Sequence, residues 1–426
     1  MNLHRGTPSS KVWYTRRHYL PAVWAISVVV LVGFSAYQGG LDPSRLASTS
    51  TSRSSAGLSS DVIPYPPCVT QEVQGVPSCA YAQLVYDATD GYVVAYMICA
   101  HTYITFAACT WKFSQGGWTN VTATHGPNPP PVLEDGFVWD AADGYAVLFG
   151  GEIYFSGAPL QSVWVFHNGV WSNLTSSSPP AIPHTFVRAV YDSTARYVLS
   201  VWQNGYLPDG NTYTWAFRSG TWTNLTSSAN GSGLPVNPSV ADDPSDGGAI
   251  LFGGLNISAR TLSDQTWLFS GGAWELLRPH VSPSTRSVPS LSYDSLAGYD
   301  LLVGGVGPTC LSSRCPILTD EWRFEDRQWT NITSTLLGDP PVEAAGPMTT
   351  DIADGYVLEG FGWSAFPLNS TAPIQSDLYA YANGTWTAFA PPSPGFSLLD
   401  AILTVAGVAA VAAVAALFIV RRRRTG

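Results

Sequence analysis

Three acidic residues are the best candidates for acid–base chemistry in this chain. Glu134 and Asp135 precede one expected strand, and Glu343 precedes another much later in the sequence. A glycosidase needs one carboxylic acid and one carboxylate on either side of the bond that it cleaves. Because Glu134 and Glu343 fall in different repeats and at slightly different depths, we favour the interpretation that each is a solvated carboxylate in a loop. A carbohydrate-active enzyme using Glu134, Asp135 and Glu343 is the alternative hypothesis.

A larger group of residues is suited to binding. Aromatic faces stack on sugar rings or anchor peptide side chains, and an arginine can hold a carboxylate through two hydrogen bonds. The candidate binding residues are Tyr103, Tyr154, Phe155, Trp202, Tyr206, Trp363, Phe366, Arg188 and Arg286. The alternatives are that the aromatic side chains pack under their own loops and, as favoured for both arginines, that these pair with neighbouring acids.

Other catalytic signatures are missing from the sequence. It contains no Gly-x-Ser-x-Gly motif, no glycine-rich phosphate loop, and no cysteine or histidine spacing typical of a structural metal. The candidate histidines are scattered, at His101, His125, His167, His184 and His280. We therefore expect no cofactor and no metal, and a binding protein rather than an enzyme.

The composition predicts an all-β protein and excludes nucleic acid as a partner. The 426 residues include 40 Gly, 32 Pro, 16 Trp, 20 Tyr and 17 Phe, and only 12% are charged. Glycine, proline, aromatic and β-branched residues favour short strands joined by tight turns. Lys11 and Lys112 are the only lysines, so a surface that neutralises phosphates is not expected.

One unit recurs six times with a period of 51 to 57 residues. Each copy has an aspartate at the end of an expected first strand, and later an aromatic residue followed seven positions on by a tryptophan. The aspartates are Asp87, Asp140, Asp192, Asp243, Asp294 and Asp351. The aromatic pairs are Trp111 and Trp118, Trp164 and Trp171, Trp215 and Trp222, Trp267 and Trp274, Trp322 and Trp329, and Tyr379 and Trp386.

Each copy divides into four strands, which predicts one blade of a β-propeller. The repeated aspartate is expected to accept backbone N–H bonds in the turn after the first strand, because its presence in every copy favours a structural role. A glycine-containing turn is expected between the third and fourth strands. Loops on the opposite face vary between copies, and variable loops on a rigid scaffold are the usual place for binding.

The repeats resemble the kelch family of β-propellers. The resemblance rests on the spaced aromatic residues and on the twin glycines Gly150-Gly151, Gly253-Gly254 and Gly304-Gly305 after the second strand. Three copies have Met97-Ile98, Trp202-Gln203 and Phe361-Gly362 there, which marks a divergent member. The resemblance implies a six-bladed propeller over residues 62–391, with repeats near 78–126, 127–178, 179–230, 231–281, 282–338 and 339–390. The ring would close by packing alone or with an added strand from residues 62–74.

Both ends of the chain predict membrane anchoring. Residues 20–38 are expected to form a transmembrane helix or signal anchor after a basic tail (1–19), and a cleaved signal peptide is the alternative. Residues 396–420 form a second apolar run, followed by a basic tail (421–426). Because basic flanks stay in the cytoplasm, the topology places everything between the two helices outside the cell.

The carboxy-terminal end resembles the archaeal PGF sorting signal, in which a tripeptide, a spanning helix and a basic tail occur in that order. Here the tripeptide is Pro394-Gly395-Phe396, within a linker at 392–395. The resemblance implies removal of the helix by a membrane sortase during lipid anchoring, and a permanent transmembrane helix is the alternative. Residues 39–61, rich in serine and threonine, are expected to form a flexible stalk.

Cysteines and glycosylation sequons fit an external location. The six cysteines lie close in pairs, and we expect disulfides Cys68–Cys79, Cys99–Cys109 and Cys310–Cys315. Eight Asn-x-Ser/Thr sequons are expected to be glycosylation sites in part: Asn120, Asn173, Asn224, Asn230, Asn256, Asn331, Asn369 and Asn383.

Together these patterns predict a surface-anchored, non-catalytic propeller at the cell membrane, with the propeller on the extracellular side. Its partners would be the membrane, through the terminal helices, and a glycan or an envelope protein, through the variable loop face. Residues 62–391 carry 27 acidic and 10 basic residues, so an acidic polysaccharide is a poor ligand.

Overall fold

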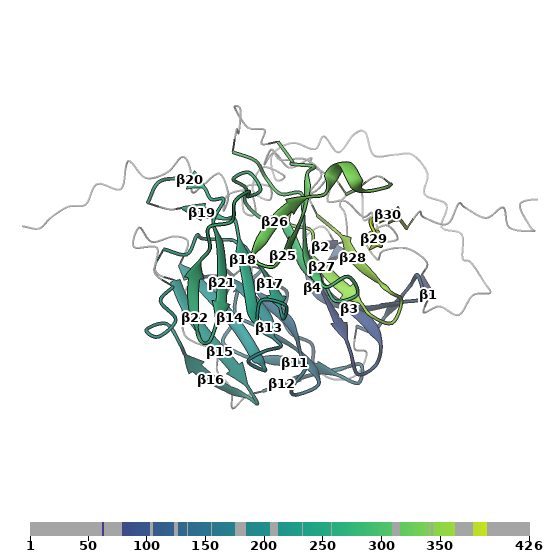
Figure 1. Ribbon diagram of the computed structural model, residues 1–426. Helices are drawn as coiled ribbons and strands as arrows, with labels where there is room; N and C mark the ends of the chain where they lie inside the picture. Colours follow the sequence, from purple (N-terminus) through teal and green to yellow (C-terminus); the bar gives the residue numbers. More distant parts are fainter. Residues whose placement is uncertain are drawn as a thin grey trace, which may run out of the picture. The chain divides into compact units, whose positions relative to one another are not determined.

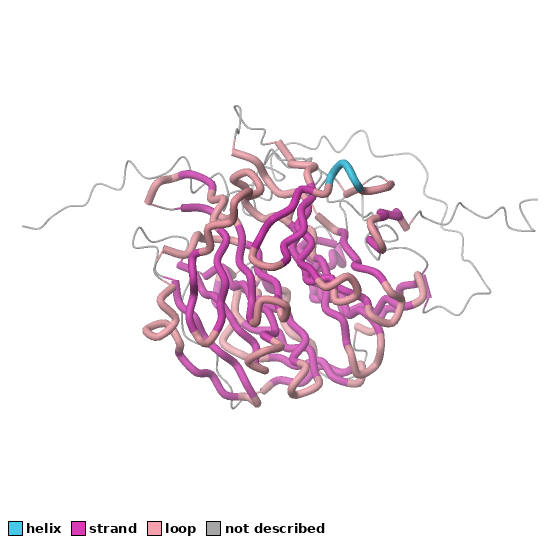
Figure 2. The backbone as a smooth tube through the Cα atoms, viewed as in Figure 1, coloured by secondary structure: helices cyan, strands magenta, loops and turns pink. Residues whose placement is uncertain are grey.

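The structure is a computed structural model. It describes residues 62–63, 79–102, 105–122, 127–133, 135–154, 156–174, 185–204, 212–231, 233–256, 258–308, 316–338, 340–341, 344–362 and 378–389. Nearly all regular structure in this part of the chain is β-strand, and one short 3-10 helix, η3 (Thr333–Thr335), is the exception (Figure 2). The all-β fold predicted from composition is confirmed.

Six sheets of four or five strands follow one another along the chain (Figure 1). Sheet 1 has the order β1-β5-β4-β3-β2, with β1 (Val62–Ile63), β2 (Cys79–Asp87), β3 (Tyr92–Thr102), β4 (Thr105–Ser114) and β5 (Gly117–Asn120). Sheet 2 contains β7 (Gly136–Asp140), β8 (Tyr145–Phe149), β11 (Trp164–His167) and β12 (Val170–Asn173). Sheet 3 contains β13 (Thr185–Asp192), β14 (Tyr197–Asn204), β15 (Thr212–Arg218) and β16 (Thr221–Asn224).

The remaining sheets repeat the same order. Sheet 4 contains β17 (Ser239–Asp243), β18 (Gly248–Phe252), β21 (Thr266–Ser270) and β22 (Ala273–Leu276). Sheet 5 contains β23 (Ser290–Asp294), β24 (Tyr299–Val303), β25 (Glu321–Glu325) and β26 (Gln328–Asn331). Sheet 6 contains β27 (Met348–Asp351), β28 (Tyr356–Gly360), β29 (Leu378–Ala382) and β30 (Thr385–Ala388).

Two small sheets are built on the loops between second and third strands, and one of them adds a strand from the segment before β7. One has the order β10-β9-β6, with β6 (Val132–Leu133), β9 (Glu152–Ile153) and β10 (Ala158–Pro159); the other pairs β19 (Leu255–Asn256) with β20 (Thr261–Leu262). An added strand from residues 62–74 is one of the two alternatives for ring closure. Residues 62–63 form β1, but it pairs with β5 at the edge of sheet 1 and joins no second sheet among the described residues. Each of the six large sheets is an antiparallel meander, so the four-strand division of every repeat is confirmed.

The repeated aspartate closes the turn after each first strand, as expected. In the first copy, Asp87 Oδ1 accepts hydrogen bonds from the backbone N–H groups of Thr89 and Asp90, at 3.0 and 3.1 Å. Equivalent bonds to the backbone are formed by Asp140, Asp192, Asp243, Asp294 and Asp351. All six aspartates are buried. Their recurrence therefore reflects turn geometry, not catalysis.

The turns between third and fourth strands also share one conformation. Both central residues have positive φ in every copy, which is the signature of a two-residue turn that matches the twist of the flanking strands. Five of these turns contain glycine, as the sequence predicts. The fifth copy instead has Asp326 and Arg327, with φ of 51° and 59°.

The twin glycines are required by close backbone packing. Gly151 has φ of 74°, and a Cβ atom there would lie 2.2 Å from the carbonyl oxygen of Leu133. Where the pair is absent, the second strand changes: β3 and β14 continue to Thr102 and Asn204, while β8 ends at Phe149. Phe361 takes the first glycine position of sheet 6 with φ of 63°. The divergence of the motif is thus a difference in strand length and turn conformation.

Neighbouring sheets pack through their first strands and through the turns that follow them. β7 contacts β2 and β13, β17 contacts β13 and β23, and β27 contacts β23 and β2. At the turns, an aspartate of one sheet accepts a hydrogen bond from a backbone N–H group in the turn between the third and fourth strands of a neighbouring sheet. These bonds join Asp143 to Ser219 at 2.8 Å, Asp246 to Arg327 at 2.8 Å and Asp354 to Gln115 at 2.7 Å.

The tryptophans of the fourth strands fill the space between sheets. Trp118, Trp171, Trp274, Trp329 and Trp386 are at most 4% exposed. Four of them donate the indole N–H to a side-chain oxygen of the preceding sheet. The acceptor residue stands directly before the repeated aromatic residue of that sheet's third strand. The bonds run from Trp171 to Thr110, from Trp274 to Thr214, from Trp329 to Thr266 and from Trp386 to Glu321.

Two sheets lack an acceptor at the equivalent position. Val163 occupies it in sheet 2 and Leu378 in sheet 6. Correspondingly, the buried Nε1 atoms of Trp222 and Trp118 have no hydrogen-bond partner among the described residues. Trp118 instead packs in one core cluster with Leu378 and Phe361, and its ring centroid lies 5.8 Å from that of Phe361. Sheets 1 and 6 therefore share a hydrophobic core.

Cys99 and Cys109 form the expected disulfide between β3 and β4, with their Cα atoms 5.9 Å apart. The other two predicted pairs involve Cys68, Cys310 and Cys315, which lie outside the described residues. The described part of the chain contains no helix that is long and apolar enough to span a membrane. Both predicted terminal helices, the stalk and the sorting signal lie outside the described residues.

Replacing both Cys99 and Cys109 by alanine is expected to lower the free energy of unfolding by about 2 to 3 kcal/mol, because the bridge restricts the unfolded chain. Urea unfolding of the two proteins under oxidising conditions measures the difference. Peptide mapping provides the independent check. A free Cys99 thiol, or Cys99 linked to a different cysteine, would contradict the assignment.

Candidate binding cavity

The first strands of all six large sheets line one cavity of about 560 Å³. Its wall includes residues at the start of these strands, such as Asp135 and Asn237, and residues of the turns that follow them, such as Ala88 and Ile352. The cavity therefore extends along the whole length of the first strands. Ile352 is 51% exposed, so the end at these turns is open to solvent.

The cavity wall mixes aromatic, apolar and neutral hydrogen-bonding groups. Its neutral polar residues include Gln83, Asn237, Ser239, Ser290, Ser292, Thr349 and Thr350. The charged side chains among the described lining residues are Asp135, Arg188 and Asp242. Such a wall can bind a small polar ligand through many hydrogen bonds and a few aromatic contacts.

Arg188, a predicted binding residue, lies in this wall but its guanidinium is held by the framework. Nε donates to the carbonyl oxygen of Pro238 at 3.0 Å, and Nη1 donates to the carbonyl oxygen of Val187 at 2.9 Å. Nη2 donates to Oδ1 of Asn237, whose backbone N–H donates to Gln203 at 2.7 Å. Arg188 thus ties β13 to the start of β17 while facing the cavity.

Arg286, the second predicted arginine, is fully buried away from the cavity. It forms a bidentate ion pair with Asp320, with distances of 2.8 and 2.7 Å, and also donates to Gly304 and Ser284. Burial is the largest single cause and would raise the pKa of Asp320, but the hydrogen bonds from Arg286 and Trp322 and the charge of Arg286 together lower it. The favoured interpretation of Arg286 as the partner of a neighbouring acid is confirmed, and it is not exposed to a ligand.

Two of the predicted binding aromatics are core residues, which corrects the expectation that they are exposed. Trp202 is 1% exposed and packs between sheets 2 and 3, with its ring stacked on Phe149 at 5.8 Å. Tyr154 is 8% exposed and packs against Ile98 and Leu133. Trp202 lies within β14 and fills space between sheets, whereas Tyr154 lies in the loop after β9 and packs beneath it.

Of the other predicted site residues, the structure describes Asp135 but not the two glutamates or the remaining aromatics. Asp135 is 3% exposed and lines the cavity at the start of β7. Glu134 and Glu343, the two candidate catalytic glutamates, lie outside the described residues. So do the predicted binding residues Tyr103, Phe155, Tyr206, Trp363 and Phe366, together with His125 and His184. The hypothesis of a carboxylate pair stays a prediction.

A ring of half-buried residues surrounds the turn end of the cavity and was not predicted as a site. Each stands one position before the repeated aspartate, at the end of a first strand. The six residues are Tyr86, Trp139, Tyr191, Asp242, Tyr293 and Thr350. The signal was present in the sequence, because an aromatic residue precedes that aspartate in four of the six copies.

Asp242 is the carboxylate of this ring. Its Oδ1 accepts a hydrogen bond from the backbone N–H of Ser193, in the turn of sheet 3, at 3.1 Å. Burial is the main cause that raises the pKa of Asp242, to about 6, while the hydrogen bonds from Ser193 act in the opposite direction. A pKa of about 6 leaves the carboxyl group mostly ionised at neutral pH.

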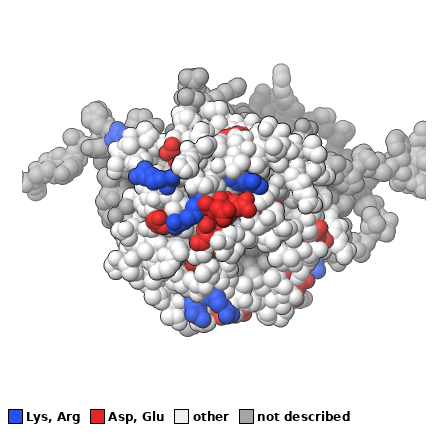
Figure 3. Space-filling model, viewed as in Figure 1, with Lys and Arg blue, Asp and Glu red and all other residues white. Residues whose placement is uncertain are grey.

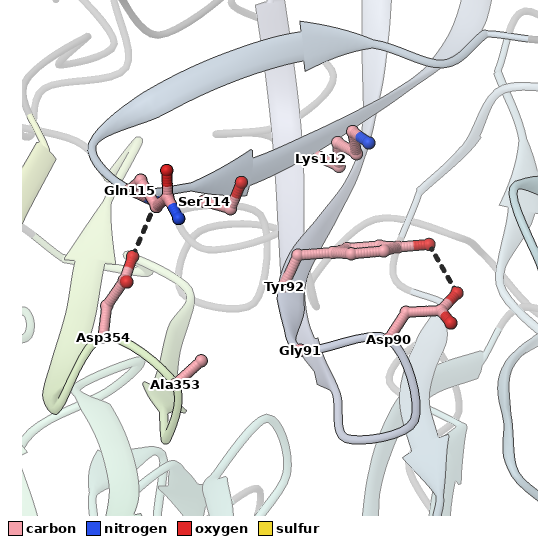
Figure 4. A pocket seen from close by; sticks show the side chains of 8 residues that line it. All are labelled: Asp90, Gly91, Tyr92, Lys112, Ser114, Gln115, Ala353 and Asp354. Atoms are coloured by element: carbon pink, nitrogen blue, oxygen red, sulfur yellow. Dashed lines mark hydrogen bonds between the residues drawn. The ribbon is translucent and has the colours of Figure 1, made fainter.

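A second pocket of about 540 Å³ lies between sheets 1 and 6 on the face that carries these turns (Figure 4). Lys112 lies 5.4 Å above the ring of Tyr92, whose hydroxyl donates to Asp90 at 3.2 Å. On the other side, Asp354 accepts the hydrogen bond from the backbone of Gln115. Its charged groups serve contacts within and between the two sheets.

The repeated Trp-x-Asn-x-Thr motif ends the fourth strand of a sheet. In sheet 3, Asn224 Oδ1 accepts a bond from the Thr226 N–H at 2.9 Å, and the Thr226 hydroxyl bonds to the backbone of Thr214. The same arrangement involves Asn120 and Asn331. Alternation places each of these asparagines on the same face of the strand as the tryptophan two positions before it. The three asparagines are nevertheless exposed while Trp118 and Trp329 are buried, because each asparagine is the last residue of its strand, as expected.

Intact-glycopeptide mass spectrometry of native protein is expected to find glycans on Asn120, Asn224 and Asn331, since each side chain reaches solvent beside its buried or half-buried tryptophan. Asn173 is less exposed and serves as the internal comparison, with lower expected occupancy. Unmodified asparagine at all four positions would mean that the sequons result from the structural repeat alone.

The described residues contain no group of three or more metal-binding side chains that could hold an ion. Charged groups on the face shown in Figure 3 gather in small patches and leave most of that surface neutral. No known protein family and no curated protein matches this chain.

Proposed function

We propose that the chain is a non-catalytic binding protein, built on a closed six-bladed propeller of the kelch type, which takes a glycan in its central cavity and the adjoining variable loops. The cavity carries this proposal, because all six sheets contribute their first strands to one wall. Its arginine is tied into the framework, and its wall is rich in neutral donors, acceptors and aromatic faces, which suits a neutral sugar better than acid–base catalysis.

Closure of the propeller is supported by contacts of one type around the whole set of sheets. The bond from Gln115 to Asp354 joins sheet 1 to sheet 6 in the same way that Ser219 joins sheet 3 to Asp143 of sheet 2. β27 contacts β2, as successive first strands contact each other elsewhere. The shared core around Trp118 and Leu378 occupies the position of the other intersheet tryptophans.

The location proposed is the outer face of the cell membrane. It is supported by the two apolar runs with basic flanks and by the disulfide between Cys99 and Cys109, since such bridges persist in oxidising compartments. An intact disulfide in protein isolated from membranes is the expected result. Recovery of the chain in the cytosol with both thiols free would contradict this location.

A glycan array probed with the full-length chain tests the function. Binding to neutral glycans without hydrolysis is expected, and Ser292→Trp, which places a large side chain in the cavity, is expected to abolish it. Ser172→Trp, at an exposed position of β12, is the matched control and should bind normally. Hydrolysis of a bound glycan that Glu134→Gln eliminates would instead establish the carbohydrate-active enzyme. Binding of a purified envelope protein, with no glycan bound, would replace the glycan by a protein ligand.

A further inference from the structure

The turn end of the cavity is framed by four aromatic side chains and one carboxylate, which we call the collar: Tyr86, Trp139, Tyr191, Tyr293 and Asp242. They come from five different sheets but from the same position in each repeat. Because the first strands of all six sheets line the cavity, these side chains lie around one opening. This opening is at the opposite end from the variable loops.

The aromatic rings of the collar are held in place from behind. Tyr86 packs against the core that sheets 1 and 6 share, Trp139 against the core of sheets 1 and 2, and Tyr191 against the core of sheets 2 and 3. The Tyr293 hydroxyl lies 3.1 Å from the hydroxyl of Ser245 in the preceding sheet. All four rings are nevertheless partly exposed and line the cavity, so they offer fixed aromatic surface to a ligand.

The surroundings of the collar are acidic. The six turns beside it contain Asp90, Asp143, Asp246 and Asp354, against Arg196 as their one basic residue. Asp242 adds a carboxylate within the opening itself. The nearest cation of the cavity wall, Arg188, is three residues from Tyr191 along β13, or about 10 Å at the usual rise of a strand. The collar therefore combines aromatic rings with an excess of carboxylates, and the one cation in the turns beside it is Arg196, whose side chain donates a hydrogen bond to the Tyr191 hydroxyl.

We infer that the collar binds an alkylated ammonium ion, through the faces of its aromatic rings and the charge of Asp242. A cation over an aromatic face is attracted by the ring quadrupole, and aromatic cages are the usual receptors of quaternary ammonium groups. A neutral apolar ligand would gain nothing from Asp242 and would have to desolvate it. A metal ion would find one carboxylate and tyrosine hydroxyls, which bind metals well only when deprotonated, and burial raises the pKa of Tyr86 and Tyr191.

Calorimetric titration of the full-length chain with choline tests the inference. The neutral comparison is 3,3-dimethylbutan-1-ol, which has the same shape with carbon in place of the charged nitrogen. Choline is expected to bind at least about tenfold more tightly than this alcohol, because the difference reports only the cationic charge. Equal affinity for both compounds would mean that the opening binds the apolar shape and not the positive charge, which would overturn the inference.

Two variants and two matched controls locate the site. Trp139→Leu keeps apolar volume but removes the aromatic face, and Asp242→Asn removes the charge; each is expected to weaken choline binding about tenfold. Tyr92→Leu alters an aromatic residue of the same face outside the cavity, and Glu325→Gln removes an exposed charge. Both controls should bind choline as the parent does.

The outcomes separate this inference from the proposed glycan function. Unchanged choline affinity in Asp242→Asn, or equal losses in variants and controls, would exclude the collar even if Trp139→Leu failed to fold. No choline binding by a chain that binds glycans would leave the glycan function standing and overturn the inference. Choline binding by a chain that binds no glycan would support the collar inference and contradict the glycan function.

Discussion

Replacing Trp329 by alanine is expected to lower the free energy of unfolding by about 4 kcal/mol, within the range usual for a buried tryptophan. The side chain is 4% exposed, and its ring centroid lies 5.1 Å from that of Phe252 in sheet 4 and 4.9 Å from that of Phe324 in its own sheet. Its indole N–H donates to Thr266 at 2.8 Å. The variant therefore loses packing, aromatic contacts and a buried hydrogen bond between two sheets. Urea unfolding measures the change.

The hydrogen bond can be separated from the packing because the repeats differ at the acceptor. Thr266→Val keeps the shape but leaves the Trp329 N–H unpaired, which is expected to cost about 1 to 3 kcal/mol. The reciprocal variant, Val163→Thr, offers an acceptor to the buried Nε1 of Trp222 and is expected to add about 1 kcal/mol. If both variants changed stability in the same direction, hydroxyl burial rather than the indole bond would be the dominant effect.

The repeat could be predicted from sequence because turns and intersheet packing impose the same residues in every copy. The aspartate before each turn and the tryptophan on each fourth strand have one structural role, and both were recognised. Trp202 was misplaced for the opposite reason. It replaces the first of the twin glycines, and in sheet 3 the second strand continues through it to Asn204, so a residue expected in a loop lies in the core.

Sequence patterns do not predict which residues of distant segments contact each other. The pairing of Arg286 with Asp320 depends on a loop of sheet 5 meeting the segment before β23. The collar was not predicted, although an aromatic residue precedes the repeated aspartate in four of the six copies. The shared role that we infer for its aromatic residues rests on their placement around one cavity, since each alone resembles a strand residue at the edge of a core.

The protein is expected to become less stable as the pH rises from about 4 to about 8, by more than about 3 kcal/mol in total. Several buried carboxyl groups carry this effect. Burial, the largest cause in each case, raises the pKa of Asp140 and Asp242 to about 6 and that of Asp243 and Glu321 to about 7. Burial also raises the pKa of the fully buried Asp300 well above its usual range.

The direction follows from proton binding. Between the pKa of the unfolded chain, near 4, and the higher pKa of the folded state, the folded protein holds more protons than the unfolded chain. The stabilisation from each such group is complete below the unfolded pKa and is lost as the pH rises through the folded pKa. Asp320, whose pKa is lowered, has the opposite effect and matters only under more acidic conditions.

Glu321→Gln isolates one of these groups. Glu321 is 1% exposed, and its Oε2 accepts the indole N–H of Trp386 at 2.7 Å. A glutamine carbonyl can accept the same bond but cannot ionise, so the variant is expected to be more stable than the parent at pH 8 by about 2 kcal/mol, and equally stable near pH 4.5. Glu325→Gln, at an exposed position of the same strand, is the control and should leave the pH profile unchanged. Thermal unfolding measured from pH 4 to pH 8 gives the comparison. An increase in the stability of the parent protein from pH 4 to pH 8 would contradict this prediction. It would mean that, in solution, cationic side chains pair with the buried carboxylates.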